Sequence, residues 1–147
     1  MKILARQLTL DLYNCNDKKF TDVEAIKTAV EGVFGSKVNI ISTDLDNEHF
    51  GLVTAFREGH IALHIYKLLK YVSVDIFTCN ESDESDELSK SLSKYFQPEK
   101  IKSTYLKRGD FGQEKEVKPK IKVRVAPLRK VRNVGAKVVK KLIQGGN

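Results

Sequence analysis

The feature that most constrains the fold is a series of four strand-like segments separated only by short turns. The segments cover residues 37–43, 50–56, 60–65 and 71–79, and they are rich in β-branched and aromatic residues or alternate between apolar and polar positions. Parallel strands need a crossover of about a dozen residues or more, and the intervals here are shorter. The sequence therefore predicts that these strands form an antiparallel sheet.

Further elements flank this central series. An alternating segment at 4–13 predicts a strand, and Thr21 with Glu24 forms a capping-box pattern before a run of helical periodicity that ends at Gly35. An acidic run at 81–87 leads into a second helical pattern, and residues 101–106 follow as another strand. The order β-α-β-β-β-β-α-β predicts an α+β fold, a two-layer sandwich with a mostly antiparallel β-sheet and helices on one face.

Two central strands carry histidine, aromatic and cysteine side chains. Side chains alternate along a strand, so His60, Ala62 and His64 share one face while the isoleucines and leucine between them share the other. Among the residues of these two strands, His60, His64, Tyr66, Phe77 and Cys79 become candidate ligand-pocket residues through the family resemblance given below. Without further information a histidine pair at this spacing is more often structural than catalytic, and no metal site is predicted.

The charge is divided unevenly along the chain. The net charge is +7, yet residues 101–147 alone carry 14 Lys and Arg against 3 Asp and Glu. We expect a domain at 1–109 and a basic C-terminal extension at 110–147, made of a strand at 120–125 and an amphipathic helix beyond Pro127. Residues 115–141 could bind an anionic partner such as nucleic acid or a membrane surface, or could pack on their own domain.

The expected location is the cytoplasm. No apolar stretch approaches the roughly 18 residues of a transmembrane segment, and the first residues lack the pattern of a secretory signal. Cys15 and Cys79 are accordingly expected to be reduced thiols.

Three blocks carry a resemblance to a known family. They are Leu10-Asp11-Leu12-Tyr13-Asn14-Cys15, Glu58-Gly59-His60-Ile61-Ala62-Leu63-His64 and Tyr71-Val72-Ser73-Val74-Asp75-Ile76-Phe77-Thr78-Cys79. In order and spacing the chain resembles the small bacterial and archaeal S-adenosylmethionine decarboxylases over about residues 3–108. The resemblance implies an enzyme that cleaves itself and converts a serine into a pyruvoyl cofactor, which then serves as an electron sink for decarboxylation.

The resemblance also assigns roles to positions. The glutamate before the cleaved bond falls on Glu58, the histidine that assists cleavage on His64, and the proton-donating cysteine on Cys79. The processing serine falls on Gly59, which offers neither a hydroxyl nor a β-carbon, so no pyruvoyl cofactor is expected. Two further departures are Gly51, where a polar serine is expected, and Leu68, where a carboxylate is expected.

These departures favour a decarboxylase-related protein that does not self-process and that acts as a binding or regulatory protein in polyamine and S-adenosylmethionine metabolism. The resemblance further implies a homodimer and a ligand such as S-adenosylmethionine or a polyamine. One alternative is an S-adenosylmethionine-using enzyme of spermidine biosynthesis or a lyase that needs no pyruvoyl group. Another is an anionic-surface binder that works through the basic tail.

Overall fold

A computed structural model describes residues 5–34, 39–79, 85–109 and 118–126. In chain order the elements are β1 (Ala5–Tyr13), a short 3₁₀ turn (Asp17–Lys19), α1 (Val23–Phe34), β2 (Asn39–Asp44), β3 (His49–Phe56), β4 (Gly59–Tyr66), β5 (Tyr71–Thr78), α2 (Ser85–Phe96), β6 (Lys100–Arg108) and β7 (Lys120–Val125). The predicted order of elements is confirmed, and β7 adds the strand expected at 120–125.

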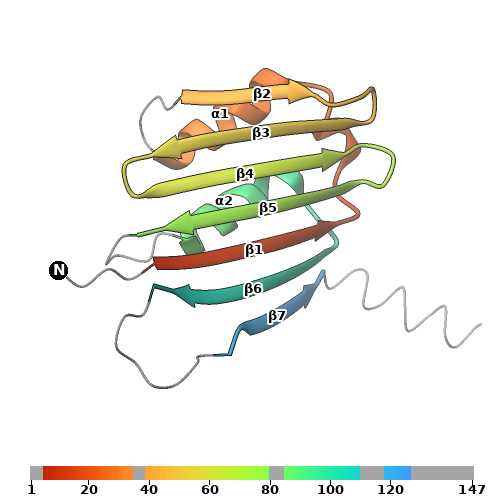
Figure 1. The fold of residues 1–147 in the computed structure, drawn as a ribbon. Coiled ribbons are helices and arrows are strands. Elements are labelled where there is room, and N and C mark those ends of the chain that lie inside the picture. Colours follow the sequence, from red (N-terminus) through yellow and green to blue (C-terminus); the bar gives the residue numbers. More distant parts are fainter. Residues whose placement is uncertain (1–4, 35–38, 80–84, 110–117, 127–147) are drawn as a thin grey trace, which may run out of the picture.

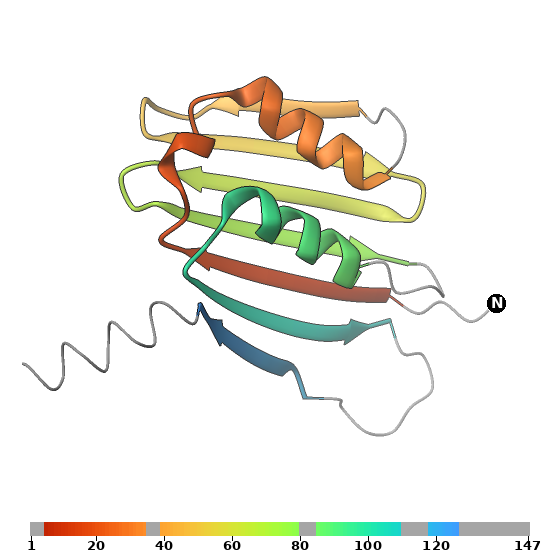
Figure 2. The same cartoon turned by 180° about the vertical axis from the view of Figure 1, so that it is seen from behind.

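All seven strands form one antiparallel sheet in the order β2-β3-β4-β5-β1-β6-β7. Both helices lie on the same face of this sheet, with α1 toward the β2 edge and α2 over β5 and β1 (Figure 1). Seen from behind, β6 and β7 extend beyond α2 (Figure 2). The structure is therefore the predicted two-layer α+β sandwich, and the sheet face opposite the helices, here called the open face, is not covered by either helix of the described ranges.

The core fills the space between the sheet and the two helices. Alternation along the strands turns one set of side chains inward, which is why β4 and β5 each bury every second residue. The fully buried side chains include Leu8, Leu10 and Leu12 of β1, Ile61, Leu63 and Ile65 of β4, and Leu92 and Phe96 of α2. At about 1.5 to 3 kcal/mol for each large apolar side chain, this burial fixes the strand register and so decides which residues reach the open face.

Two local details differ from the sequence predictions. The N-cap of α1 is Asp22, whose Oδ1 accepts a hydrogen bond from the Ala25 N–H at 3.0 Å, while the Thr21 hydroxyl donates to the Lys18 carbonyl oxygen. The capping box predicted at Thr21 is therefore wrong by one residue, because the preceding 3₁₀ turn engages Thr21. Strand β5 ends at Thr78, so Cys79 is an exposed residue just beyond the strand instead of its last member.

The basic extension is described only in part. Strand β7 pairs with β6 from Lys100 opposite Val125 to Tyr105 opposite Lys120, and it forms the edge of the sheet. The amphipathic helix predicted beyond Pro127 lies outside the described residues. Among the helices of the described ranges, none is long and apolar enough to cross a membrane.

Candidate functional site

The open face carries the candidate residues in registered rows that run across the strands. Strand pairing sets Gly51 opposite His64, His64 opposite Ser73, and Ser73 opposite Asp11. The next row toward the β3–β4 turn holds Val53, Ala62, Asp75 and Thr9, and the one after it holds Ala55, His60, Phe77 and Gln7. Small and polar side chains thus occupy the middle of the face, with rings at both ends.

At the end of the sheet near the β3–β4 turn, β4 begins with Gly59, which alternates with the open-face residue His60 and lies in close main-chain contact with β5. Gly59 pairs with Thr78, and the Cys79 N–H donates to the Glu58 carbonyl oxygen at 2.6 Å. An ideal β-carbon built on Gly59 would overlap with the Phe77 carbonyl oxygen and would lie 2.8 Å from the Phe77 carbonyl carbon. Backbone atoms therefore occupy the position of any side chain at residue 59.

At the opposite end, side chains make the contacts. His49 Nε2 and His64 Nδ1 lie 2.8 Å apart, and the His49 ring stacks on Tyr66 with centroids 4.2 Å apart. A β-carbon on Gly51 would meet Leu45 Cδ1 at 3.5 Å and His64 Cε1 at 3.7 Å, which are ordinary van der Waals distances. A small side chain at residue 51 would therefore fit beside the imidazole of His64.

An aromatic row continues from this histidine pair across the sheet. Tyr66 stacks on Tyr71 at 5.7 Å, Tyr71 contacts Tyr13 at 5.4 Å, and the Lys100 ammonium lies 5.1 Å above the Tyr13 ring. The Tyr71 hydroxyl donates a hydrogen bond to Asp11. Burial, followed by this hydrogen bond and the negative charge of Asp11, raises the pKa of Tyr71 above its ordinary value, so Tyr71 stays a neutral donor at physiological pH.

The structure brings some of the predicted site residues together and separates others. His60 stacks on Phe77 with ring centroids 5.2 Å apart, and the Arg108 guanidinium group lies 5.6 Å from the centroid of the same Phe77 ring. His64 and Tyr66 share the far end, with ring centroids 6.5 Å apart. His64 lies five residue steps along β4 from Gly59, which corresponds to about 17 Å. Within one chain His64 therefore does not reach the Glu58–Gly59 bond.

The two cysteines lie in contrasting environments. Cys79 is exposed beside Gly59, whereas Cys15 is buried, with its thiol donating to the Leu12 carbonyl oxygen at 3.6 Å. Burial raises the pKa of the Cys15 thiol from 9.0 to about 12, although a hydrogen bond from the backbone at Val72 lowers it in part. Cys15 is thus an inert core residue, and Cys79 is the thiol that solvent and ligands can reach.

Comparison with known proteins identifies the family of this chain. A family model described as S-adenosylmethionine decarboxylase matches residues 6–109, well over half of the chain. The chain belongs to the S-adenosylmethionine decarboxylase family.

Relatives and a solved structure agree with this family. The chain is 27% identical over 122 residues to an S-adenosylmethionine decarboxylase proenzyme of Methanococcus maripaludis, which covers 79% of this chain and 100% of the relative. A proenzyme of Clostridium kluyveri is 26% identical over 124 residues, covering 80% of this chain and 97% of the relative. The crystal structure of the adenosylmethionine decarboxylase of Aquifex aeolicus matches with a TM-score of 0.67 at 20% identity, covering 80% of this chain and 100% of that chain, and shows the shared fold.

The S-adenosylmethionine decarboxylase family pattern did not reveal every residue of this face. His49 and Tyr71 were not among the predicted pocket residues, yet they flank His64 and Tyr66 directly. A signal for His49 is present in the sequence, because a two-residue turn between Phe56 and Gly59 fixes the hairpin register and sets His49 opposite Tyr66. In the described part of the chain, no group of three or more His, Cys, Asp or Glu residues could hold a metal ion.

Proposed function

We propose that this chain is a non-catalytic member of its family, a binding or regulatory protein of S-adenosylmethionine and polyamine metabolism. The observation that carries the proposal is the closed backbone at Gly59, where the Phe77 carbonyl oxygen lies in the place of a β-carbon. The names of its relatives, S-adenosylmethionine decarboxylase proenzymes, support the metabolic assignment.

The chemistry of residue 59 supports the absence of self-processing. An acyl shift at the Glu58 carbonyl needs a hydroxyl on the next residue, and a pyruvoyl group needs that residue's β-carbon for its methyl group. Gly59 supplies neither, so the residues here do not fit a pyruvoyl cofactor. The Cys79 N–H still polarises the Glu58 carbonyl oxygen at 2.6 Å, but no neighbouring hydroxyl at residue 59 can attack it.

The carboxylates and aromatic rings of the open face favour binding of a cationic ligand. Asp75 is half-buried and lies in the middle row between the small side chains of Ala62 and Thr9, and Asp11 lies in the adjacent row. The rings of Tyr66 and Phe77 border these carboxylates on either side. Carboxylates flanked by aromatic faces attract sulfonium and ammonium groups, which S-adenosylmethionine and polyamines respectively carry.

One experiment tests the activity and the binding together. The mass of the purified full chain is first measured by intact-mass spectrometry. The chain is then titrated by calorimetry with S-adenosylmethionine, its decarboxylated form and spermidine. We expect a single uncleaved mass, binding of at least one of the three, and recovery of S-adenosylmethionine unchanged after incubation. Two fragments divided between Glu58 and Gly59 would overturn the proposal, as would conversion of S-adenosylmethionine to any product.

Matched variants locate the binding. Asp75→Asn removes one negative charge from the centre of the open face, and we expect it to weaken cation binding about tenfold, which corresponds to about 1.4 kcal/mol. Glu31→Gln on α1 removes the same charge from the opposite, helix-covered side of the sheet and serves as the control. Equal weakening by both variants would mean that general electrostatics, and not the open face, governs the binding.

We also propose that the protein is a homodimer joined through the open face. Exposed apolar side chains lie on this face near both sheet edges: Ile41 and Val53 on β2 and β3, and Leu106, Ile121 and Val123 on β6 and β7. A second copy would cover these groups. Light scattering should give a dimer mass for the natural chain and a monomer mass for Val53→Glu, whereas Leu69→Glu in the exposed β4–β5 turn should leave the dimer intact. A natural chain that is monomeric at micromolar concentration contradicts this proposal.

A further inference from the structure

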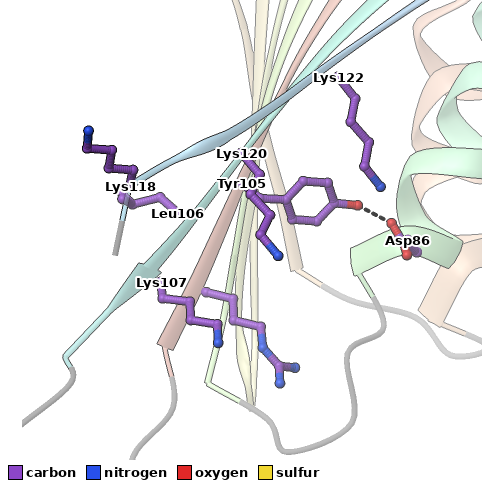
Figure 3. A pocket seen from close by; sticks show the side chains of 8 residues that line it. Asp86, Tyr105, Leu106, Lys107, Lys118, Lys120 and Lys122 are labelled. Carbon is purple, nitrogen blue, oxygen red and sulfur yellow. Dashed lines mark hydrogen bonds between the residues drawn. The ribbon is translucent and has the colours of Figure 1, made fainter. Parts of the chain in front are cut away.

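A basic groove lies on the other side of the sheet, between α2 and the β6–β7 edge. It consists of two adjoining cavities of about 250 and 360 Å³ that share Asp86, Tyr105 and Lys122 in their walls. Tyr105, Lys107, Lys120 and Lys122 extend toward α2, and the Tyr105 hydroxyl donates a hydrogen bond to Asp86 across the groove (Figure 3). Helix α2 and strands β6 and β7 thus border one groove that is separate from the candidate site on the open face.

The charge of this groove is one-sided. Asp86 is the single carboxylate among its described lining residues, and it already accepts the Tyr105 hydroxyl. Its lining cations are Arg6, Lys90, Lys107, Lys118, Lys120, Lys122 and Arg124. Of these, Lys107, Lys120 and Lys122 form no ion pair with any carboxylate of the described residues.

The sheet register explains why the cations gather here. Lys120, Lys122 and Arg124 alternate with Ile121 and Val123, so the three charged side chains share the face toward α2 while the two apolar ones share the open face. Successive charges on this face stand about 7 Å apart along the strand. Lys122 also lies 5.7 Å from the centre of the Tyr105 ring, which holds its stem against β6.

Neutral hydrogen-bond donors complete the wall. Ser89 and Ser93 lie on the stripe of α2 that faces the groove, and Ser103 lies opposite them on β6. The cavity volumes are typical of small-molecule sites. Lysine, arginine and serine side chains converging on such a space are the donors that bind phosphate oxygens.

We propose that this groove binds a compact small molecule that carries several phosphate groups. A nucleic acid fits less well, because Tyr105 is the only aromatic residue among the described lining residues and Lys122 already covers its ring, which leaves no stacking platform for bases. A membrane fits less well because the cations line a recess between a helix and two strands instead of a flat or convex surface. Residues 115–141 are those expected to meet an anion, and of them the structure describes 118–126.

The basic groove depends on residues of the C-terminal extension. The family model ends at residue 109, whereas Lys118, Lys120, Lys122 and Arg124 come from the segment that follows it. The groove also lies on the opposite side of the sheet from Asp75 and His64. A ligand here would therefore bind independently of the open face, and binding at one site can be measured with the other intact.

Tripolyphosphate is a suitable probe, titrated into the full chain by calorimetry at low and moderate salt. We expect saturable one-to-one binding that weakens as salt rises, with orthophosphate at least about tenfold weaker because it engages fewer cations. The variant Lys120→Gln/Lys122→Gln should weaken tripolyphosphate binding at least about tenfold, since it removes two central charges without changing side-chain length greatly.

The matched control is Lys18→Gln/Lys94→Gln, which lowers the net charge equally at exposed positions outside the groove. We expect it to change the affinity less than about twofold, and circular dichroism should show that both variants are folded. Equal losses in the two variants would overturn the proposal, as would failure of tripolyphosphate to bind. Tighter binding of single-stranded DNA or of phosphatidylserine vesicles than of tripolyphosphate, lost in Lys120→Gln/Lys122→Gln, would also overturn it in favour of a macromolecular partner.

Discussion

Two glycines lie near opposite ends of the central strands, Gly51 on the open face and Gly59 on the helix-covered face, and they are not equivalent. At Gly59 the neighbouring strand approaches so closely that the Phe77 carbonyl oxygen fills the place of a side chain. At Gly51 the nearest atoms to an added β-carbon belong to the side chains of Leu45 and His64, at 3.5 and 3.7 Å. At Gly59 main chain fills the place of a side chain, and at Gly51 only side chains border that place.

This difference teaches how the two positions can change. A side chain that is crowded by other side chains is accommodated by small rotamer shifts, whereas one that is crowded by a paired backbone requires the strands to separate. The β4–β5 pairing continues from Tyr66 opposite Tyr71 to Gly59 opposite Thr78. The hydrogen bond from the Cys79 N–H to the Glu58 carbonyl oxygen extends this pairing by one residue. The sheet itself therefore maintains the absence of a side chain at residue 59.

The largest expected effect comes from Gly59→Ser. Its β-carbon would force the Phe77 carbonyl away and break the last pairs of β4 and β5, so we expect a loss of about 3 kcal/mol in the free energy of unfolding. Urea unfolding followed by circular dichroism measures this loss. Intact mass should show the variant uncleaved, because restoring the hydroxyl does not restore the space around it.

Gly51→Ser is the matched comparison. The same substitution at the side-chain-bordered end should change stability by less than about 1 kcal/mol in either direction, since the lower entropy of the unfolded chain offsets the mild crowding. Similar losses at both positions would contradict the distinction between a main-chain and a side-chain border. Efficient cleavage of Gly59→Ser would show that the backbone there opens easily.

The layered fold could be predicted because it depends on patterns that the sequence displays directly. Alternation in β1, β4 and β5 identifies both faces of the sheet, and short connections dictate antiparallel pairing. The α1 cap was misplaced by one residue because Thr21 and Asp22 are both good capping residues and only the path of the preceding turn selects between them.

Which candidate residues share a face could be predicted from strand alternation, but their contacts could not. His60 and Phe77 were assigned to one pocket, and they do stack; His64 and Cys79 were assigned to it as well, but they lie near opposite ends of the face. Family spacing fixes residue numbers along the chain and says nothing about distance along an extended strand. The closure at Gly59 and the groove beside β7 depend on the approach of strands and helices, which no local pattern encodes.

The next expected effect concerns the cysteines, which mark the two ends. A thiol reagent at pH 8 should modify Cys79, beside Gly59, at least about 100-fold faster than Cys15, because Cys15 is only 3% exposed and reacts when the core opens. Cys79→Ala should remove the fast phase and leave the slow one. Two equally fast phases would mean that the core near β1 opens readily.

Cys15 also predicts a dependence of stability on pH. Its pKa is raised from 9.0 to about 12 in the folded protein, so the neutral thiol favours folding fully below pH 9. As pH rises from about 9 to about 12 the unfolded chain ionises first, and this contribution is lost. Cys15→Ala should therefore lose less stability across this range than the natural chain does, whereas Cys79→Ala should follow the natural chain.

A last prediction, with an effect well below that of Gly59→Ser, tests whether side-chain contacts hold the Gly51 end together. Tyr71→Phe removes the hydroxyl that donates to Asp11 while keeping the ring contacts with Tyr13 and Tyr66, and we expect a loss of about 1 kcal/mol in the free energy of unfolding. Tyr13→Phe is the control, because the Tyr13 hydroxyl makes no hydrogen bond with a described residue, and it should cost less than about 0.3 kcal/mol. In an Asp11→Asn background the effect of Tyr71→Phe should shrink, since the charge that strengthens the bond is gone. If Tyr71→Phe costs the same in the Asp11→Asn background, the loss of stability comes from packing of the ring and not from the hydrogen bond to Asp11. Ring contacts of the aromatic row alone would then stabilise this end.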